Sequence, residues 1–317
     1  MIVPVADLKG GPVEPLCGKF HDDLRETQLL LNEVLLCVGE EKKWFFVEAQ
    51  EQEKLTPRGL RVGYPGWVNK KAVIPVAEPL ITNAITVRGT VVVTDLSGVT
   101  TGVTHLSAGT RLCLTGERRD GFAEVTLLGA AKGWIEEHDV LGTNVLLGIG
   151  KQRRQIIETA LSFAGTPYLW GGRSTHLPSP HHVTSQKSNH NPKTLGDGNA
   201  TATGIDCSGL TQISYRVGGI DIPRNAYDQW KVSQWVDPGE LEPADLIFLS
   251  NEGHQGTIAH VMIYLGNEEL IGAEATGSVV TVTTFSKKFG HKRDDILYNN
   301  SSASLGKIYC GSFIGAK

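Results

Sequence analysis

The residues best suited to nucleophilic chemistry lie in the stretch D-C-S-G at 206–209. Apolar residues at helical spacing follow it (Leu210, Ile213 and Val217), which predicts a helix with a cysteine in its first turn. Unpaired backbone N–H groups and the positive end of the helix dipole meet there, so we expect the pKa of Cys207 to be lowered and an oxyanion to be bound. A small buried cysteine at a helix start would show the same pattern, because a cysteine needs a base before it acts as a nucleophile.

The candidate base is His260, at the head of a strand-like run, A-H-V-M-I-Y-L-G, at 259–266. A histidine in this position is equally typical of an ordinary core residue whose ring is hydrogen-bonded. A cysteine–histidine pair must meet in space rather than in sequence. The sequence alone leaves open whether Cys207 and His260 do so.

Five motifs follow one another in the second half of the chain. They are Y-L-W-G-G at 168–172, D-C-S-G-L at 206–210, I-P-R-N-A-Y-D-Q at 222–229, P-A-D-L-I-F at 243–248 and A-H-V-M-I-Y-L-G at 259–266. In this order they resemble the NlpC-type cell-wall cysteine peptidases, over residues 151–317. The resemblance implies a circularly rearranged papain-like fold, with Cys207 as nucleophile and His260 as base.

The same resemblance implies roles for further residues. The Tyr168 hydroxyl would help the Cys207 backbone N–H to hold the oxyanion, and Asp206 would receive the free ammonium of an N-terminal L-alanine in a charge-assisted hydrogen bond. A purely structural role for Asp206, as N-cap of the helix, is the alternative. Further substrate contacts are expected from Ser208, Arg224, Gln229 and Trp170.

Two positions depart from the family pattern. Gly272 stands where relatives carry a second histidine that orients the first. Glu274 is two residues further on, hence on the same face of a strand, and a carboxylate that accepts the imidazole N–H is chemically sound as the third catalytic member. A solvated acid at a strand end is the alternative. Ala226 replaces a common serine, which removes one expected substrate hydrogen bond.

Residues 1–145 contain a weak internal repeat. Leu30–Val38 resembles Leu106–Leu114, and each copy closes on a glycine–tryptophan pair, at 66–67 and 133–134. Short alternating strands with turns between them predict small β-barrels, and the pattern resembles two bacterial SH3-like domains. Similar peptidases use a tyrosine of the first such domain to close the substrate site, which suggests Tyr64; packing on the Pro-Gly turn is the alternative.

We therefore predict an α+β chain with SH3-like domains at 1–77 and 78–145 and a papain-like peptidase domain at 146–317. A polar segment at 173–203 interrupts the last domain and is predicted to be a flexible insertion beside the site. Its histidines lack a companion cysteine or acid cluster, so no metal and no cofactor is expected. They are His176, His181, His182 and His190.

The composition is that of a globular protein, with 40% hydrophobic and 20% charged residues. A formal net charge of −4 gives no reason to expect nucleic acid as a partner, and no apolar run is long enough to span a membrane. Five scattered cysteines and no signal-peptide pattern favour a cytoplasmic protein, and a monomer is expected. The expected activity, implied by the resemblance, is hydrolysis of the γ-D-glutamyl–diamino acid bond of murein-derived peptides, with a free N-terminal L-alanine. The alternatives are an amide or ester hydrolase of other specificity, or a non-catalytic peptidoglycan-binding protein.

Overall fold

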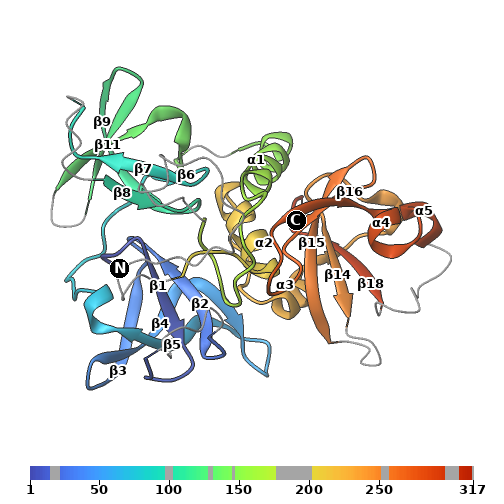
Figure 1. Cartoon of the computed structure of the whole chain (residues 1–317), viewed down its shortest axis with the longest axis horizontal. Helices are drawn as coiled ribbons and strands as arrows, with labels where there is room; N and C mark the ends of the chain where they lie inside the picture. The colour runs from blue at the N-terminus through green and yellow to red at the C-terminus, as the bar shows by residue number, and fades with distance from the viewer. Residues whose placement is uncertain are drawn as a thin grey trace, which may run out of the picture.

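The computed structural model describes residues 1–14, 22–96, 103–127, 131–144, 147–175, 202–250, 257–296 and 307–315. Three antiparallel sheets follow one another along these parts of the chain. Figure 1 shows the two N-terminal sheets on one side and the C-terminal sheet on the other, with helices α1 (Ile149–Ser162) and α2 (Cys207–Val217) between them. The predicted α+β class, with β-sheet domains before the helix-containing part, is confirmed.

The first sheet has the strand order β2-β1-β5-β4-β3. Its inward side chains, among them Leu8, Leu29, Val47 and Val68, form a buried core of their own. The strands are β1 (Val5–Lys9), β2 (Arg25–Leu30), β3 (Leu35–Glu41), β4 (Trp44–Leu55) and β5 (Arg61–Asn69).

The second sheet has the strand order β12-β6-β9-β10-β11-β7-β8. It encloses a separate core that includes Leu106, Leu112 and Ile135, and Leu31 of the first domain joins it. The strands are β6 (Ala84–Thr86), β7 (Thr90–Val93), β8 (Val103–Leu106), β9 (Arg111–Arg119), β10 (Phe122–Thr126), β11 (Lys132–Glu136) and β12 (Val140–Gly142).

The repeated glycine–tryptophan pairs occupy equivalent places in the two sheets. A Cβ on Gly66 would lie 2.7 Å from Leu8 Cγ, and one on Gly133 would lie 2.4 Å from Val92 Cγ1. Both distances are too short for any side chain, so each glycine lets its strand approach β1 or β7 closely. A one-turn 3-10 helix follows in each copy, η1 (Lys70–Ala72) and η3 (Glu137–Asp139).

The C-terminal sheet has the strand order β13-β18-β14-β15-β16-β17. Its strands are β13 (Gln234–Trp235), β14 (Leu246–Ser250), β15 (Ile258–Gly266), β16 (Glu269–Gly272), β17 (Thr281–Thr284) and β18 (Ile308–Ser312). Its shorter helices are α3 (Ala226–Val232), η5 (Pro238–Glu240), α4 (Phe285–Phe289) and α5 (Arg293–Ile296). None of the helices in the described ranges combines the length and the apolar character needed to cross a bilayer.

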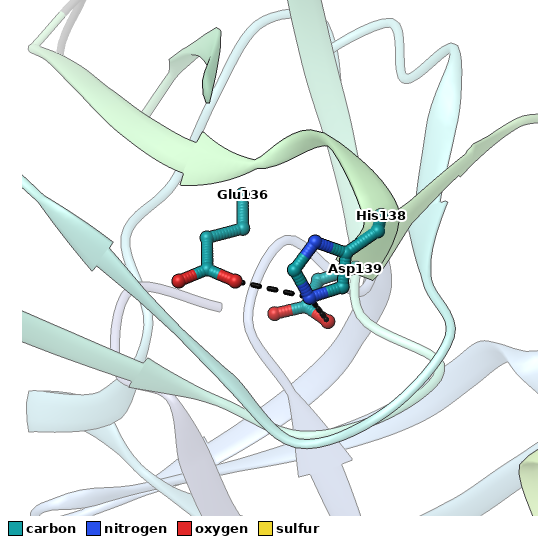
Figure 2. A group of neighbouring side chains, drawn as sticks. All are labelled: Glu136, His138 and Asp139. Carbon is teal, nitrogen blue, oxygen red and sulfur yellow. Dashed lines mark ion pairs between the residues drawn. The ribbon is translucent and has the colours of Figure 1, made fainter. Parts of the chain in front are cut away.

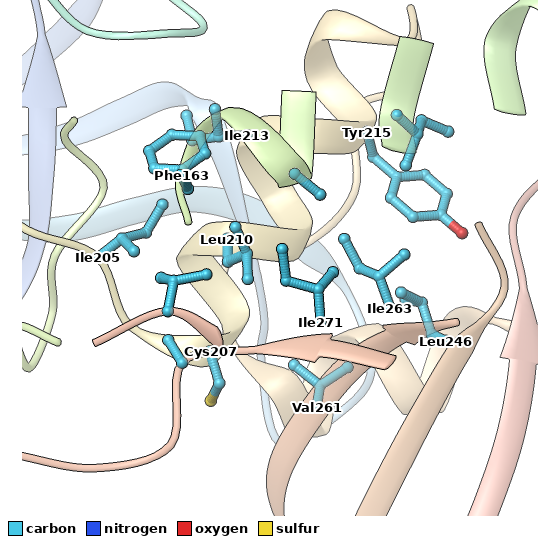
Figure 3. Close-up of a cluster of buried hydrophobic side chains, with 14 of the residues drawn as sticks. Phe163, Ile205, Cys207, Leu210, Ile213, Tyr215, Leu246, Val261, Ile263 and Ile271 are labelled. Carbon is cyan, nitrogen blue, oxygen red and sulfur yellow. The ribbon is translucent and has the colours of Figure 1, made fainter. Parts of the chain in front are cut away.

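The core between α2 and this sheet positions the cysteine. Leu210 and Ile213, on one face of α2, pack with Val261 and Ile263 of β15, as Figure 3 shows. Leu30 and Ala108, which come from the two N-terminal domains, belong to the same buried cluster. The helix that carries Cys207 is therefore held by all three domains.

A chain of buried charges also joins the three domains. Glu33 Oε1 lies 2.9 Å from Arg173 Nη1 and 3.3 Å from Arg216 Nη1, and Arg216 also binds Glu51, which Arg111 contacts at 3.0 Å. Burial alone would raise the pKa of Glu33, but the two guanidinium groups outweigh it and that pKa is lowered.

The predicted insertion at 173–203 begins later than expected. The side chains of Arg173, Ser174 and Thr175 are buried and hydrogen-bonded, because they belong to the contact with the N-terminal domains. Residues 176–201, with the four histidines of the insertion, lie outside the described residues. The boundary at 145/146 also lies outside them, and the predicted domain limits stay a prediction.

Candidate active site

Cys207 is the first residue of α2, directly after the N-cap Asp206. The cysteine is 8% exposed, and burial raises its pKa to about 12; the charge of Asp206 raises it further. Hydrogen bonds from the backbone of Val261 and Ser208, and the charge of Arg224, lower it by less. The expected lowered pKa is therefore wrong for the free protein, because desolvation outweighs the helix terminus. The thiol needs a base to become nucleophilic.

His260 lies on β15, and its neighbour Val261 supplies the backbone contact to Cys207. The structure thus brings the predicted base to the strand that touches the thiol. Burial lowers the pKa of His260, Glu274 and Asp206 raise it, and Lys288 lowers it, with a lowered pKa as the net result. At neutral pH the imidazole is therefore uncharged, which is the form that can accept the thiol proton.

Tyr168 is placed by a parallel bridge to Ile205, two residues before Cys207. It is 8% exposed, and burial together with the charges of Cys207 and Asp206 raises the pKa of its hydroxyl. The hydroxyl therefore stays protonated close to the thiol, as a hydrogen-bond donor must. The N–H of Cys207, in the first turn of α2, has no partner within the helix and is a second donor at this point.

Asp206 is committed to structural bonds. Its Oδ1 accepts hydrogen bonds from Gly209 N at 2.6 Å, Ser208 Oγ at 3.2 Å and Arg224 Nη1 at 3.0 Å, and its Oδ2 accepts one from Arg224 Nη2 at 2.7 Å. The carboxylate thus caps α2 and is neutralised by a bidentate arginine. This differs from the expectation that Asp206 meets a substrate ammonium.

Arg224 lies behind the site rather than in it. Its remaining donors reach Thr27 Oγ1 at 2.7 Å, Ser208 Oγ at 2.8 Å and Gly172 O at 3.3 Å, so all five N–H groups are used. Arg224 and Ser208 are both buried and already paired, and their expected contact with substrate stays a prediction. Arg224 ties β2 of the first domain to the residues on either side of Cys207.

The other two predicted contacts differ from each other. Gln229 is fully buried; it accepts a hydrogen bond from Thr211 and donates to the carbonyls of Ser208 and Pro223, and its substrate contact stays a prediction. Trp170 is 50% exposed, and its carbonyl accepts a hydrogen bond from Arg25. Half of its surface is therefore open to solvent, and its predicted substrate contact stays a prediction.

Glu274 approaches His260 without bonding to it. Its Oε2 lies 3.7 Å from His260 Nε2, beyond hydrogen-bond distance, and it binds Lys288 Nζ. A Cβ on Gly272 would lie 3.7 Å from the same Nε2, so the position of the family histidine is adjacent to the imidazole. The predicted third residue is near the base, but the predicted hydrogen bond is not formed.

Tyr64, from β5, meets the catalytic domain. Its Oη lies 3.0 Å from Glu26 Oε2 and 3.3 Å from Asn225 Oδ1, and Asn225 directly follows Arg224. The sequence analysis suggested Tyr64 but missed Glu26 and Asn225. These residues are far apart in the chain, and no local spacing marks them.

A histidine–carboxylate cluster lies elsewhere, in the second domain, as Figure 2 shows. His138 Nε2 lies 3.0 Å from Glu136 Oε2 and 3.5 Å from Asp139 Oδ1. Arg88 Nε, 3.2 Å from Asp139 Oδ1, already supplies a cation there, and His138 is well exposed. We assign this cluster no metal.

Comparison with known proteins agrees with this geometry. The NlpC/P60 family model matches residues 165–296. The chain is 26% identical, over 87% of its length and 81% of the relative, to the gamma-D-glutamyl-L-lysine dipeptidyl-peptidase of Bacillus subtilis (strain 168). It is 36% identical to the peptidoglycan endopeptidase RipB of Mycobacterium tuberculosis (strain CDC 1551 / Oshkosh), over 42% of this chain and 47% of RipB.

Among solved structures, the crystal structure of an NlpC/P60 family protein from Bacillus cereus ATCC 10987 matches with a TM-score of 0.72 and 20% identity, over 99% of this chain and 98% of that one. At this identity the match concerns the fold, which includes the N-terminal sheets. The C-terminal part of the chain is an NlpC/P60 domain, preceded by two β-sheet domains.

Proposed function

We propose that this protein is a cysteine peptidase that hydrolyses the γ-D-glutamyl–diamino acid bond of murein-derived peptides with a free N-terminal L-alanine. Similarity to two gamma-D-glutamyl-L-lysine dipeptidyl-peptidases supports this, since it extends over 87% and 82% of the chain and so includes N-terminal sheet residues. The site supplies a nucleophile, an uncharged base and oxyanion donors.

The chemistry follows from these groups. His260 takes the Cys207 proton as the sulfur attacks the γ-glutamyl carbonyl carbon, and the oxyanion receives hydrogen bonds from the Cys207 N–H and Tyr168 Oη. The C–N bond then breaks, and the leaving amine takes the proton from His260. Water hydrolyses the thioester by the same steps, which restores the thiol.

The Glu26–Tyr64–Asn225 cluster carries the proposed specificity. Three oxygens converge there, Tyr64 Oη with Glu26 Oε2 and Asn225 Oδ1, and only one of them, the hydroxyl, holds a hydrogen. A cluster of side chains with several hydrogen-bond acceptors, one donor and a negative charge is suited to bind an ammonium ion, which offers three N–H donors and no acceptor.

The position of this cluster relative to the thiol also supports the proposal. Glu26 precedes Thr27, and Asn225 follows Arg224, while Arg224 binds Thr27 and both neighbours of Cys207. The proposed ammonium site would therefore be linked to the residues beside Cys207 through a single side chain, that of Arg224. Because Arg224 neutralises Asp206, the role first expected of Asp206 is proposed here for Glu26.

The test follows cleavage of three peptides by mass spectrometry. They are L-Ala-γ-D-Glu-diaminopimelate, its N-acetylated form, and the corresponding peptide with L-lysine as the diamino acid. The wild type should prefer the free amine by about a hundredfold in kcat/KM, since a hydrogen bond to a charged group is worth roughly 1.5–3 kcal/mol. Glu26→Gln and Tyr64→Phe should lose activity mainly on the free peptide. Glu40→Gln, on the exposed face of β3, is the matched control and should change neither rate.

Equal wild-type rates on free and acetylated peptides would point to the intact wall instead. Cleavage of amides that lack a γ-D-glutamyl linkage would favour the hydrolase of broader specificity. Tight binding of the peptides without turnover would favour the non-catalytic peptidoglycan-binding protein. A free-amine preference suits released peptides, so we also propose a cytoplasmic monomer. Cell fractionation and light scattering test those two points.

A further inference from the structure

The second nitrogen of the proposed base, His260 Nε2, is buried. Among the residues that the structure describes, it has no hydrogen-bond partner. For the other ring nitrogen to accept the Cys207 proton, the neutral ring must carry its hydrogen on Nε2, and the imidazolium that forms must place a charge there. Some group has to stabilise that N–H.

Among the described residues, Glu274 supplies the carboxylate that lies within 4 Å of His260 Nε2, and Lys288 binds the same carboxylate. Its Oε2 lies 3.7 Å from His260 Nε2 and is bonded to Lys288 Nζ. The Lys288 side chain is 17% exposed and that of Glu274 33%, so solvent weakens this pair only in part. Glu274 Oε2 thus faces two competing cations. One is the Lys288 ammonium, and the other is the His260 imidazolium, which forms only during catalysis.

The fold fixes the position of Lys288. It lies on the one-turn helix α4, whose Phe285 and Phe289 are buried in the core behind the sheet. Thr284 caps the start of this helix, and Gly290, with φ 78°, ends it. Strand β17, which leads into α4, pairs with β16, which leads to Glu274.

We propose that Lys288 is a positioning residue for this site: it holds the Glu274 carboxylate just beyond reach of neutral His260 and releases it to the imidazolium once His260 has taken the Cys207 proton. This rests on the proposed role of His260 as the base. In the step, the S–H bond breaks and a ring N–H forms, Nε2–H donates to Glu274, and the pair with Lys288 re-forms when the proton passes to the leaving amine.

In this chain the arrangement would take the place of the second histidine that the family resemblance leads us to expect at Gly272. The charged groups that face His260 are Glu274 after β16, Lys288 on α4 and Asp206 before α2, with the Cys207 thiol beside them. Asp206 is neutralised by Arg224, so Glu274 and Lys288 are the pair whose balance can shift. Their removal should therefore have opposite effects on the protonation of His260.

The experiment measures the acidic limb of the kcat/KM–pH profile on the free tripeptide, and independently titrates His260 by NMR with histidine labelled at Cε1. The resonance is assigned by its loss in His260→Gln. In Lys288→Met, Glu274 is free to bind the ring, so the pKa of His260 and the acidic limb should rise by roughly one pH unit. In Glu274→Gln both should fall, and kcat should drop about ten- to a hundredfold.

Two controls separate this effect from a loss of structure. Lys287→Met removes the adjacent, exposed lysine of the same helix and should change neither observable. Lys288→Arg keeps the charge and should keep both values within about 0.3 pH unit. In a Glu274→Gln background, Lys288→Met should shift the pKa far less than in the wild type, because the effect acts through the carboxylate.

An unchanged His260 pKa in Lys288→Met would overturn the inference, as would a full-sized shift in the Glu274→Gln background. The NMR titration needs no turnover. Normal peptide cleavage without the predicted shifts would therefore refute the role of Lys288 alone. The predicted shifts in a protein without peptidase activity would support the charge arrangement and refute the proposed function.

Discussion

Replacing Arg224 by methionine tests whether the buried arginine supports the nucleophile. The substitution keeps the length of the side chain and removes a guanidinium with five hydrogen bonds, two of them to Asp206. The Arg224 and Asp206 side chains are 2% and 10% exposed, so the substitution would leave the buried Asp206 without its partner and with little water to replace the arginine. Breaking a buried pair from one side costs about 3–5 kcal/mol, and we expect a loss of stability of that size.

A double variant separates the ion pair from simple packing. Asp206→Asn keeps the oxygen that caps α2 through Gly209 and removes the charge. In Arg224→Met/Asp206→Asn no buried charge is left unpaired, so about 2 kcal/mol or more of the loss should be recovered. Arg224→Lys should lie between wild type and Arg224→Met, since one ammonium cannot reach both oxygens and Thr27 together.

The assay is urea unfolding, followed by tryptophan fluorescence and by far-UV circular dichroism, because coincident curves show whether one transition describes the whole chain. The reasoning is refuted if Arg224→Met loses less than about 1 kcal/mol, or if the double variant is no more stable than the single one. Either result would mean that water reaches Asp206 and replaces the arginine.

Three further predictions concern single groups. Cys207→Ser should fold normally and lose at least about a thousandfold in kcat, since an alkoxide is far harder to form than a thiolate; more than a tenth of the wild-type turnover would contradict the proposed nucleophile. Because burial raises the pKa of Cys207, its alkylation by iodoacetamide should be slow at neutral pH and still accelerate above pH 9; fast, pH-independent labelling would contradict this. Glu33→Gln should cost about 3 kcal/mol at neutral pH, because buried Arg173 loses its carboxylate partner and Arg216 keeps only Glu51. Since the folded-state pKa of Glu33 is lowered, its contribution to the free energy of unfolding is complete above the ordinary glutamate pKa and is lost as the pH falls through the lower folded value. The difference in stability between wild type and Glu33→Gln should therefore disappear in acid. A difference that does not change with pH would show that Glu33 is not charged.

A fifth prediction concerns the missing histidine. Gly272→His in the Glu274→Gln background should restore part of the lost kcat, because a Cβ at 272 lies beside His260 Nε2. It also lies 3.1 Å from Met262 Cγ, so the flexible methionine must move. No recovery in a correctly folded variant would mean that the imidazole is oriented by Glu274 in a way that histidine cannot reproduce.

The sequence predicted the parts of the site that depend on local pattern. The start of α2, the place of Cys207 in its first turn and the strand that carries His260 follow from periodicity and motif order. The pKa of Cys207 did not follow, because burial is a property of the packed molecule and here outweighs the helix terminus. An N-cap aspartate could be foreseen, but not that an arginine 18 residues later would bind both its oxygens.

Contacts between domains were the least predictable. Glu26 and Lys288 stand in stretches without any motif, and the fold alone brings them to Tyr64 and Glu274. Arg173 is the first residue of a polar segment that predicts an insertion. It is nevertheless buried, because it pairs with Glu33, 140 residues earlier in the chain. Such pairs depend on how the sheets dock, which composition and spacing do not encode.

The charges shared by the three domains bear on how such a chain can change in evolution. Glu33 and Glu51 come from the first sheet, Arg111 from the second, and Arg173 and Arg216 from the catalytic domain. Exchange of one sheet for a homologous one by recombination would leave buried guanidinium or carboxylate groups without partners, at a cost of several kcal/mol. The N-terminal sheets and the peptidase domain must therefore be inherited together, and their sequences should drift as one unit rather than as three separable modules.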